Sequence, residues 1–166
     1  MNPLDGTPRP RLGEILVQRG KLDAQALERA LRLQQESGGE KLGALLVTLG
    51  LCAQRDVAEA LSYQLGIPLA DGKAYPELPI LEEQVSARFL RESRALPVRE
   101  DADELVLAMA DPTDAYTIGA FRMVTGRRVR PMVAIPTELE AALERLYGAG
   151  KSQLGQIVGD VEQRDE

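Results

Sequence analysis

The sequence predicts a mixed α+β protein, in which a duplicated helical half precedes a small α/β unit. The first observation is an internal repeat, because residues 11–34 and 41–64 align at an offset of 30 positions. The second is a change of pattern after residue 94, where short apolar runs bounded by polar turns replace helical spacing. The third is size, since 166 residues suffice for one medium domain or two small ones.

The repeated block has the pattern of a helix, a turn and a second helix. A self-match at a fixed period indicates a duplicated unit, and two copies are too few for a solenoid. We therefore expect two helix-turn-helix repeats. The identical pairs are Leu12/Leu42, Gly13/Gly43, Leu16/Leu46, Val17/Val47, Gly20/Gly50, Ala30/Ala60, Leu31/Leu61 and Gln34/Gln64.

Each copy contains its own helix start and stop signals. Gly20 is expected to end the short first helix, and Asp23 to cap the second. Residues 35–40 (QESGGE) are the expected joint between the copies, and Gly66 is expected to close the second copy. The expected buried stripes are Leu27, Ala30, Leu31 and Gln34 in the first copy, and Val57, Ala60, Leu61 and Gln64 in the second.

The second half of the chain follows a ββαβα order after one preceding helix. Polar turns separate the strands, Gly126 stops the middle helix, and residues 137–140 have the pattern of a capping box. The expected elements are a helix over 82–93, strands over 95–98 and 104–110, a helix over 111–125, a strand over 127–135, and a helix from 137 to about 148.

These elements divide the chain into five parts. The lead-in is rich in proline and is expected to be disordered, and the last segment has a weak apolar stripe that suggests a tether. The expected parts are a lead-in (1–10), a duplicated helical half (11–70), a connector and helix (71–93), a small α/β unit (94–150), and a linker to a missing domain (151–166).

Composition limits the possible partners. The net charge of −6 argues against general binding to DNA, RNA or anionic lipid, although residues 1–41 sum to +1 and would attract an anion most readily. No apolar run approaches membrane-spanning length, and the N-terminus lacks the apolar core of a signal peptide. We therefore expect a cytoplasmic protein without direct membrane insertion. The single cysteine, Cys52, aligns with Leu22 and is expected in the core.

Catalytic motifs are lacking, so we expect neither an enzyme nor a metal site in this chain. There is no histidine, and no Cys, Asp or Glu cluster has metal-site spacing. Residues 148–152 (GAGKS) resemble the end of a Walker A loop, but Arg145 stands at the first glycine position. A helix is also expected there in place of the strand that precedes such a loop.

The repeats hold candidate ligand-binding residues. Arg11 offers a planar fork for a phosphate or a guanine O6/N7 edge, and Gln34 and Gln64 can both donate and accept hydrogen bonds. Gly13 and Gly43 would let a ligand approach the backbone. The candidate apolar faces for purine rings are Leu12, Leu16, Leu27, Leu31, Leu42, Leu46, Val57 and Leu61. From the residues alone, these leucines could equally be core and the glycines helix stops.

The two blocks resemble the MshEN domain, the N-terminal module of type II secretion and type IV pilus ATPases (GspE/PilB class). The blocks read RLGxxLVxxGxLxxxxLxxALxxQ and KLGxLLVxxGLxxxxxVxxALxxQLGIP. The later LPVREDADELVLAMADPTD and TGRRVRPMVAIPTELEAALERLYG are similar to the α/β half of that N-terminal region. The resemblance implies a cyclic di-GMP ligand wrapped by both blocks, at the matching positions Arg11, Leu12, Gly13, Gln34, Leu42, Gly43 and Gln64.

The resemblance also implies partners and a location. The expected partners are cyclic di-GMP, the cytoplasmic domain of an inner-membrane secretion or pilus platform protein, and the protein's own downstream ATPase domain. The protein would then be cytoplasmic and peripheral to the inner membrane. Lys41 stands where some second blocks carry arginine, so it offers a point charge instead of a fork. The alternative is a docking module for the platform protein that binds no nucleotide.

Overall fold

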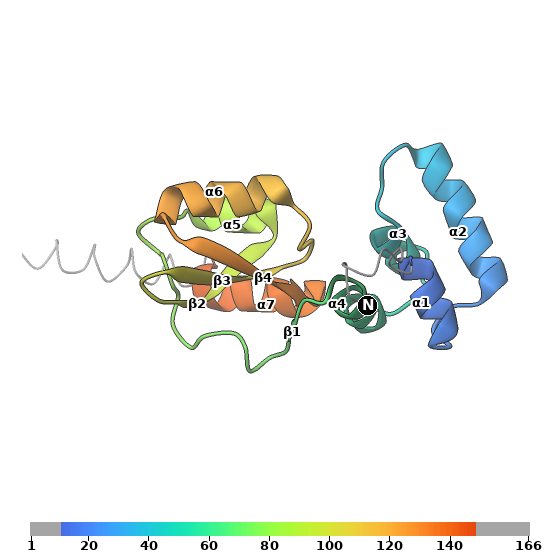
Figure 1. Cartoon of the computed structure of the whole chain (residues 1–166), viewed down its shortest axis with the longest axis horizontal. Helices are drawn as coiled ribbons and strands as arrows, with labels where there is room; N and C mark the ends of the chain where they lie inside the picture. The colour runs from blue at the N-terminus through green and yellow to red at the C-terminus, as the bar shows by residue number, and fades with distance from the viewer. Residues whose placement is uncertain (1–10, 149–166) are drawn as a thin grey trace, which may run out of the picture. The chain divides into compact units, whose positions relative to one another are not determined.

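The computed structural model describes residues 11–148 and divides the chain into two compact units between Leu69 and Ala70. The described residues form seven helices and four strands, which confirms the predicted mixture of α and β structure (Figure 1). The expectations for residues 1–10 and 151–166, and for most of the Walker-like sequence 148–152, lie outside the described residues.

The first unit consists of four helices. The turn after the first helix of each copy is the same: Gly20 and Gly50 both have φ of +72°, and each donates its N–H to a carbonyl three residues back at 3.0 Å. Glycine adopts this left-handed conformation without steric cost, so it stops both helices at the same place. The helices are α1 (Leu12–Gln18), α2 (Ala24–Ser37), α3 (Leu42–Thr48) and α4 (Gln54–Leu65).

The joint between the copies is shorter than predicted. Helix α2 continues to Ser37 and ends at Gly38, which has φ of +72°. Residues 35 and 36 are therefore helical, because glutamine and glutamate favour a helix and the first left-handed glycine comes only at position 38. The predicted joint over 35–40 is wrong for its first half.

The four helices pack crosswise between the copies. Helix α1 packs on α4, and α3 packs on α2. The first helix of each copy thus packs on the second helix of the other. The small core that results consists of Ile15, Leu16, Leu22, Ala26, Ala30, Leu46, Cys52, Val57 and Ala60. Cys52 is buried, as predicted.

The second unit is built on a four-stranded sheet with the order β1-β4-β3-β2. Strands β2 and β3 pair antiparallel, and β3 pairs parallel with β4, with Glu104 opposite Arg128. The two-residue β1 was not predicted, because two residues show no alternation. The strands are β1 (Leu69–Ala70), β2 (Ala95–Glu100), β3 (Glu104–Met109) and β4 (Arg128–Ala134).

Three helices flank this sheet: α5 (Ala87–Ser93), α6 (Ala115–Thr125) and α7 (Pro136–Tyr147). Strand β3 is buried without interruption from Leu105 to Met109. Successive side chains of a strand point to opposite faces, so both faces of the sheet are covered. Figure 1 shows the strands between α6 and α7.

Helices α5 and α6 begin later than predicted, and α7 begins with a different start signal from the one predicted. Helix α5 begins after Ser86, whose Oγ accepts from the Phe89 N–H at 3.0 Å, and not at residue 82. Helix α6 begins after Asp114, because Asp111 instead closes a turn by accepting from the Thr113 N–H at 3.0 Å. The capping box predicted at 137–140 is wrong.

Pro136 occupies the first turn of α7, and Ile135 precedes it without a side-chain cap. Proline has no N–H to satisfy and its φ fits a helix start, so it took precedence over the threonine signal. The predicted end is confirmed, since α7 stops at Tyr147.

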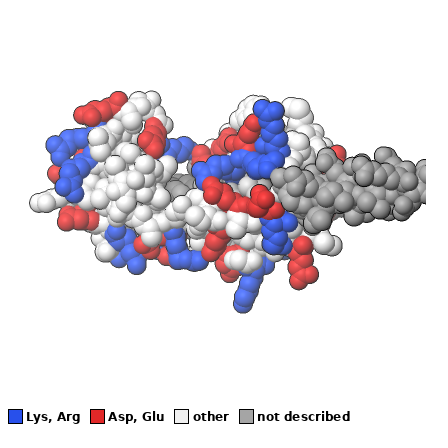
Figure 2. Space-filling model, turned by 180° about the vertical axis from the view of Figure 1, so that it is seen from behind, with Lys and Arg blue, Asp and Glu red and all other residues white. Residues whose placement is uncertain are grey.

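Charges of both signs are spread over the surface. Figure 2 shows Lys and Arg interspersed with Asp and Glu on the face it displays, without a field of one sign. Within residues 11–148, no helix is both long and apolar enough to cross a bilayer.

Candidate functional site

The two blocks begin in the same way. Arg11 and Lys41 directly precede α1 and α3, have extended backbones with ψ of 151° and 142°, and are exposed. Residue by residue, positions 11–20 show the same sequence of buried, half-buried and exposed side chains as positions 41–50. The two cationic residues predicted to meet a ligand therefore occupy equivalent, accessible places.

The predicted glycines lie in tight helix packing. A Cβ on Gly13 would lie 2.5 Å from Leu27 Cδ1, and a Cβ on Gly43 would lie 2.9 Å from Val57 Cγ1. These two contacts are equivalent under the repeat. Both glycines are buried, so their absent side chains make room for the second helix of their own copy.

The structure brings the two blocks together at Leu12. A Cβ on Gly43 would also lie 3.3 Å from Leu12 Cδ2, so a leucine of the first block reaches the glycine of the second. Leu12, Gly43 and Val57 thus form a three-residue contact that joins the copies. Among the predicted residues, this is the clearest case of both blocks contributing to one place.

Burial separates the predicted apolar residues into a buried, an exposed and a half-buried group. Leu16 and Leu46 are 0% exposed and Val57 is 7% exposed, so they belong to the core. Leu31, by contrast, is 39% exposed, although Leu61 at the equivalent position is half-buried. The half-buried group consists of Leu12, Leu27, Leu42 and Leu61.

The glutamines at the end of each block are half-buried. The Gln34 side chain donates from Nε2 to the Glu40 carbonyl oxygen at 3.1 Å. This bond holds the end of the first block against the residue just before Lys41. The half-buried amide group thus has a partner, as a partly desolvated donor requires, and Gln34 lies near the start of the second block.

Three contacts between the copies were not predicted. The Arg19 guanidinium lies 5.0 Å from the centroid of the Tyr63 ring, and Lys21 Nζ lies 3.7 Å from Asp56 Oδ1. The Cys52 thiol donates to the Lys21 carbonyl oxygen at 3.6 Å. No sequence signal indicated these contacts, because they depend on the crosswise packing of the helices.

The thiol of Cys52 is in an environment that makes it unreactive. Burial raises its pKa above the ordinary value, and the nearby Asp56 carboxylate raises that pKa further. The thiol therefore remains protonated near neutral pH, and a protonated, buried cysteine is a poor nucleophile. Its place in the site region is structural.

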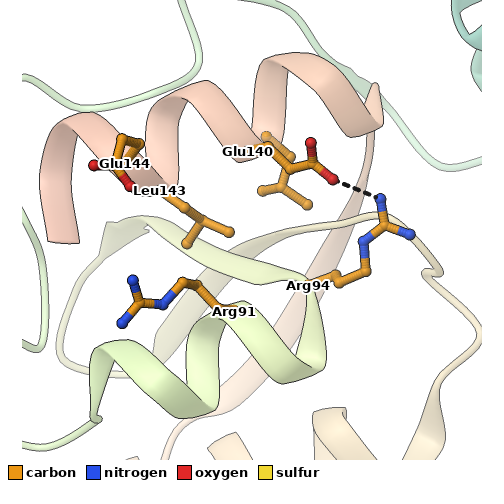
Figure 3. Close-up of a pocket in the computed structure, with 6 residues that line it drawn as sticks. Arg91, Arg94, Glu140, Leu143 and Glu144 are labelled. Atoms are coloured by element: carbon orange, nitrogen blue, oxygen red, sulfur yellow. Dashed lines mark hydrogen bonds and ion pairs between the residues drawn. The ribbon is translucent and has the colours of Figure 1, made fainter. Parts of the chain in front are cut away.

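The second unit has a separate cavity that involves none of the predicted residues. It has a volume of about 310 Å³ and lies between α5 and α7 (Figure 3). Arg91, Arg94, Glu140 and Glu144 lie around it, and Arg94 Nη2 pairs with Glu140 Oε1 at 3.2 Å. The balanced charges give no preference for an anion or a cation. Residues 11–148 contain no group of His, Cys, Asp and Glu side chains suited to a metal ion.

Several known proteins are similar to this chain in sequence. The type II secretion system protein E of Xanthomonas campestris is 40% identical over 164 residues, covering 94% of this chain and 29% of that protein. The type IV pilus assembly ATPase PilB of Myxococcus xanthus is 30% identical over 151 residues, covering 91% of this chain and 26% of that protein. The chain thus spans less than a third of the length of these relatives.

Solved structures extend the likeness to the fold. The N-terminal domain of XpsE superposes with a TM-score of 0.69 at 39% identity, covering 83% of this chain and 94% of that one. MshE with cdg superposes with a TM-score of 0.62 at 29% identity, covering 84% of this chain and 100% of that one. The sequence pattern of the MshEN domain matches residues 65–153, which is more than half of the 166 residues. The chain therefore belongs to the MshEN domain family, which includes N-terminal regions of type II secretion and type IV pilus ATPases.

Proposed function

We propose that this chain is the N-terminal regulatory domain of a type II secretion or type IV pilus ATPase and binds cyclic di-GMP through its two repeated blocks. The observation that carries the proposal is the equivalence of the blocks. Positions 11–20 and 41–50 share their backbone turns and their exposure, residue by residue. Two equivalent half-sites suit a ligand made of two identical nucleotides. The likeness to MshE with cdg, an abbreviation of cyclic di-GMP, supports the choice of ligand.

The proposed site uses the accessible members of each block. Arg11 and Lys41 supply one cation per half-site for the two ligand phosphates, and both are exposed. Leu12, Leu31 and Leu42, with Leu27 and Leu61, offer apolar surface to the guanine rings. Leu16, Leu46 and Val57 support these residues from the core, because they have almost no exposed surface.

The glutamines provide the polar contacts to guanine. A primary amide can donate and accept at the same time, which matches a guanine edge. Gln34 Nε2 now donates to the Glu40 carbonyl, and the side-chain oxygen remains as the acceptor for a guanine N–H. Gly13 and Gly43 act by setting the helix spacing that places these groups, since both pack on the second helix of their copy.

Calorimetric titration of the chain with cyclic di-GMP tests the proposal. We expect one ligand per chain and far weaker binding of GMP, which fills one half-site and loses the gain from linking two contacts. Arg11→Ala should remove a charge-assisted hydrogen bond worth about 1.5–3 kcal/mol and weaken binding roughly ten- to a hundredfold. The matched control is Arg29→Ala, which removes the same charge from an exposed position of α2.

Lys41→Arg sharpens this test. It gives the second block a planar guanidinium group like that of Arg11 in the first block, and it should therefore tighten binding. Circular dichroism must show every variant folded. If the native chain gives no heat at high micromolar ligand and Lys41→Arg does not restore it, the sensor proposal is wrong. An equal loss of affinity in Arg29→Ala would mean that Arg11 acts only through the net positive charge of the unit and makes no specific contact with the ligand.

A second candidate is a docking module for the cytoplasmic domain of an inner-membrane platform protein, which would hold the ATPase at the inner membrane from the cytoplasm. Lys41 favours it, since the second block lacks the arginine fork. The identity to type II secretion protein E, 40%, also exceeds the 29% to MshE with cdg. A pull-down with platform proteins that survives Arg11→Ala would support docking independent of nucleotide.

A further inference from the structure

Helix α6 has an apolar face that no other described part of the second unit (residues 70–148) covers. Tyr116 is 82% exposed and Met123 is 85% exposed, the highest values among the large apolar side chains described. These two residues lie on one side of the helix, two turns apart, with Gly119 and Ala120 between them. Val124, which is 53% exposed, continues the same surface. We call these five residues the α6 face.

Gly119 is the second unusual feature of this face. Glycine inside a helix is destabilising relative to alanine. A Cβ on Gly119 would meet nothing within 4 Å, so no neighbour among the described residues requires a glycine here. A missing side chain between two projecting ones leaves a depression, which lets another segment approach the helix backbone closely.

The charge around the α6 face selects the kind of occupant. Residues 115–134 contain four arginines and neither aspartate nor glutamate. Arg127 pairs with Glu100 and Arg130 with Glu104. Arg122 and Arg128 are exposed and have no ion pair with the described residues. A second copy of this face would bring arginines together, so the charge favours an acidic apolar segment instead.

The chain itself contains such a segment. Leu154, Ile157, Val158 and Val161 recur at the spacing of one helix face. Residues 151–166 hold four acidic and two basic side chains, with all four acids after position 159. Leu154 lies six residues beyond Gly148, so it can reach about 20 Å from the end of α7. That distance is large for a unit of this size, whose expected radius of gyration is about 12 Å.

We propose that residues 151–166 dock on the α6 face. The apolar stripe covers Tyr116, Met123 and the depression at Gly119, and the acidic residues after position 159 pair with Arg122 and Arg128. The contact is independent of nucleotide binding, because it involves only the second unit and the segment that follows it. It would set the direction in which the chain leaves the domain.

Oxidation of Met123 by hydrogen peroxide tests this contact in the full chain, with mass spectrometry as the readout. A docked segment shields the exposed thioether, whereas Met109, which is 0% exposed, serves as an internal reference. Ile157→Asp places a charge in the stripe and should release the segment. The matched control, Gln156→Asp, adds the same charge on the opposite side of the expected helix face.

We expect Met123 in the native chain and in Gln156→Asp to oxidise about five-fold more slowly than in Ile157→Asp, since tethering supplies a roughly millimolar effective concentration. Equal rates in all three chains would overturn the proposal. Protection that grows with protein concentration would also overturn it, because it would indicate a second copy as the occupant.

A charge reversal provides the second measurement. Arg122→Glu should raise the oxidation rate of Met123, and 1 M salt should reduce the difference, because it screens exposed ion pairs. Arg91→Glu reverses an exposed arginine on α5 and should leave the rate unchanged. Equal effects of the two reversals would overturn the pairing with Arg122.

Discussion

The two copies of the repeat agree in their interior and differ at their surface. Leu16 and Leu46 are both fully buried, and Gly13 and Gly43 both accommodate the residue 14 positions later. At the start of the second helix, however, Asp23 Oδ1 accepts from the Gln25 N–H at 2.8 Å, whereas Ala53 provides no side-chain cap. Core packing therefore accounts for the architecture that the two copies share, and the copies differ at surface positions such as the start of the second helix.

The contacts between copies show the same division. Arg19 lies over the Tyr63 ring at 5.0 Å, where α1 packs on α4. The equivalent positions in the other contact are Leu49 and Leu33, which are 42% and 41% exposed. One crosswise contact thus has a cation–π pair at its rim, and the other has two leucines there. The difference is of small energy, since an exposed cation–π pair is worth about 0.5–1 kcal/mol.

Truncation of the paired core leucines should give the largest effect. Leu16→Ala and Leu46→Ala each leave a cavity in a small core, and we expect each to lower the free energy of unfolding by about 2–5 kcal/mol. Chemical denaturation followed by circular dichroism measures both. If the interiors are equivalent, the two losses should agree within about 1 kcal/mol. A large difference would mean that Leu16 and Leu46 do not contribute equally to the free energy of unfolding.

Alanine at the two glycines should give the next largest effect and separate the copies. In Gly43→Ala the new Cβ meets Val57 Cγ1 at 2.9 Å, and valine is stiff at χ1, so we expect a loss of about 1–3 kcal/mol. In Gly13→Ala the Cβ meets the methyl end of Leu27, which can rotate away. Alanine also favours the helix, so Gly13→Ala should cost less than about 1 kcal/mol. The reverse order, measured by denaturation, would contradict this reading of the packing.

The helix cap should account for a third, smaller difference. Asp23→Ala removes the acceptor for the Gln25 N–H and should destabilise the unit by about 1 kcal/mol. Ala53→Asp supplies the missing cap to α4 and should stabilise it by a similar amount. Thermal unfolding of the two variants measures opposite shifts. A loss of stability in Ala53→Asp would mean that the second copy excludes a charge there.

The sequence predicted the helix stops well and the tertiary contacts poorly. Gly20 and Gly66 stop their helices where expected, because a left-handed glycine is a local signal. The start of α7 was misread because Pro136 and Thr137 offer two competing start signals one residue apart. Strand β1 was missed because Leu69 and Ala70 form a strand only by pairing with β4.

The candidate site shows a similar limit. The repeat alone identified the equivalent residues, but it gave Leu31 and Leu61 the same role. The structure leaves Leu31 39% exposed and Leu61 half-buried. That difference arises from crosswise packing between helices distant in sequence, which a one-dimensional pattern does not contain. Of the polar residues in the two blocks, Arg11 and Lys41 are exposed and Gln34 and Gln64 are half-buried, and the binding experiments above test their roles.

The smallest expected effect concerns Cys52, a core residue whose equivalent in the first copy is Leu22. Burial, and then the Asp56 carboxylate, raise the pKa of the folded thiol above its ordinary value of 9.0. The folded state thus keeps its proton where the unfolded chain releases it. This contribution to stability is complete below the unfolded pKa and is lost as the pH rises above it.

Replacing the thiol tests this directly. In Cys52→Leu, which restores the residue found at Leu22, the fall in unfolding free energy between about pH 9 and pH 10 should become shallower. Tyr75 and Tyr147 also make stability pH-dependent, because burial raises the pKa of Tyr75 to about 12 and that of Tyr147 above its ordinary value. Both tyrosines are present in the two proteins, so their contribution cancels in the comparison. Identical slopes would show that the thiol is as accessible in the folded chain as in the unfolded one, and that the second copy opens at Cys52.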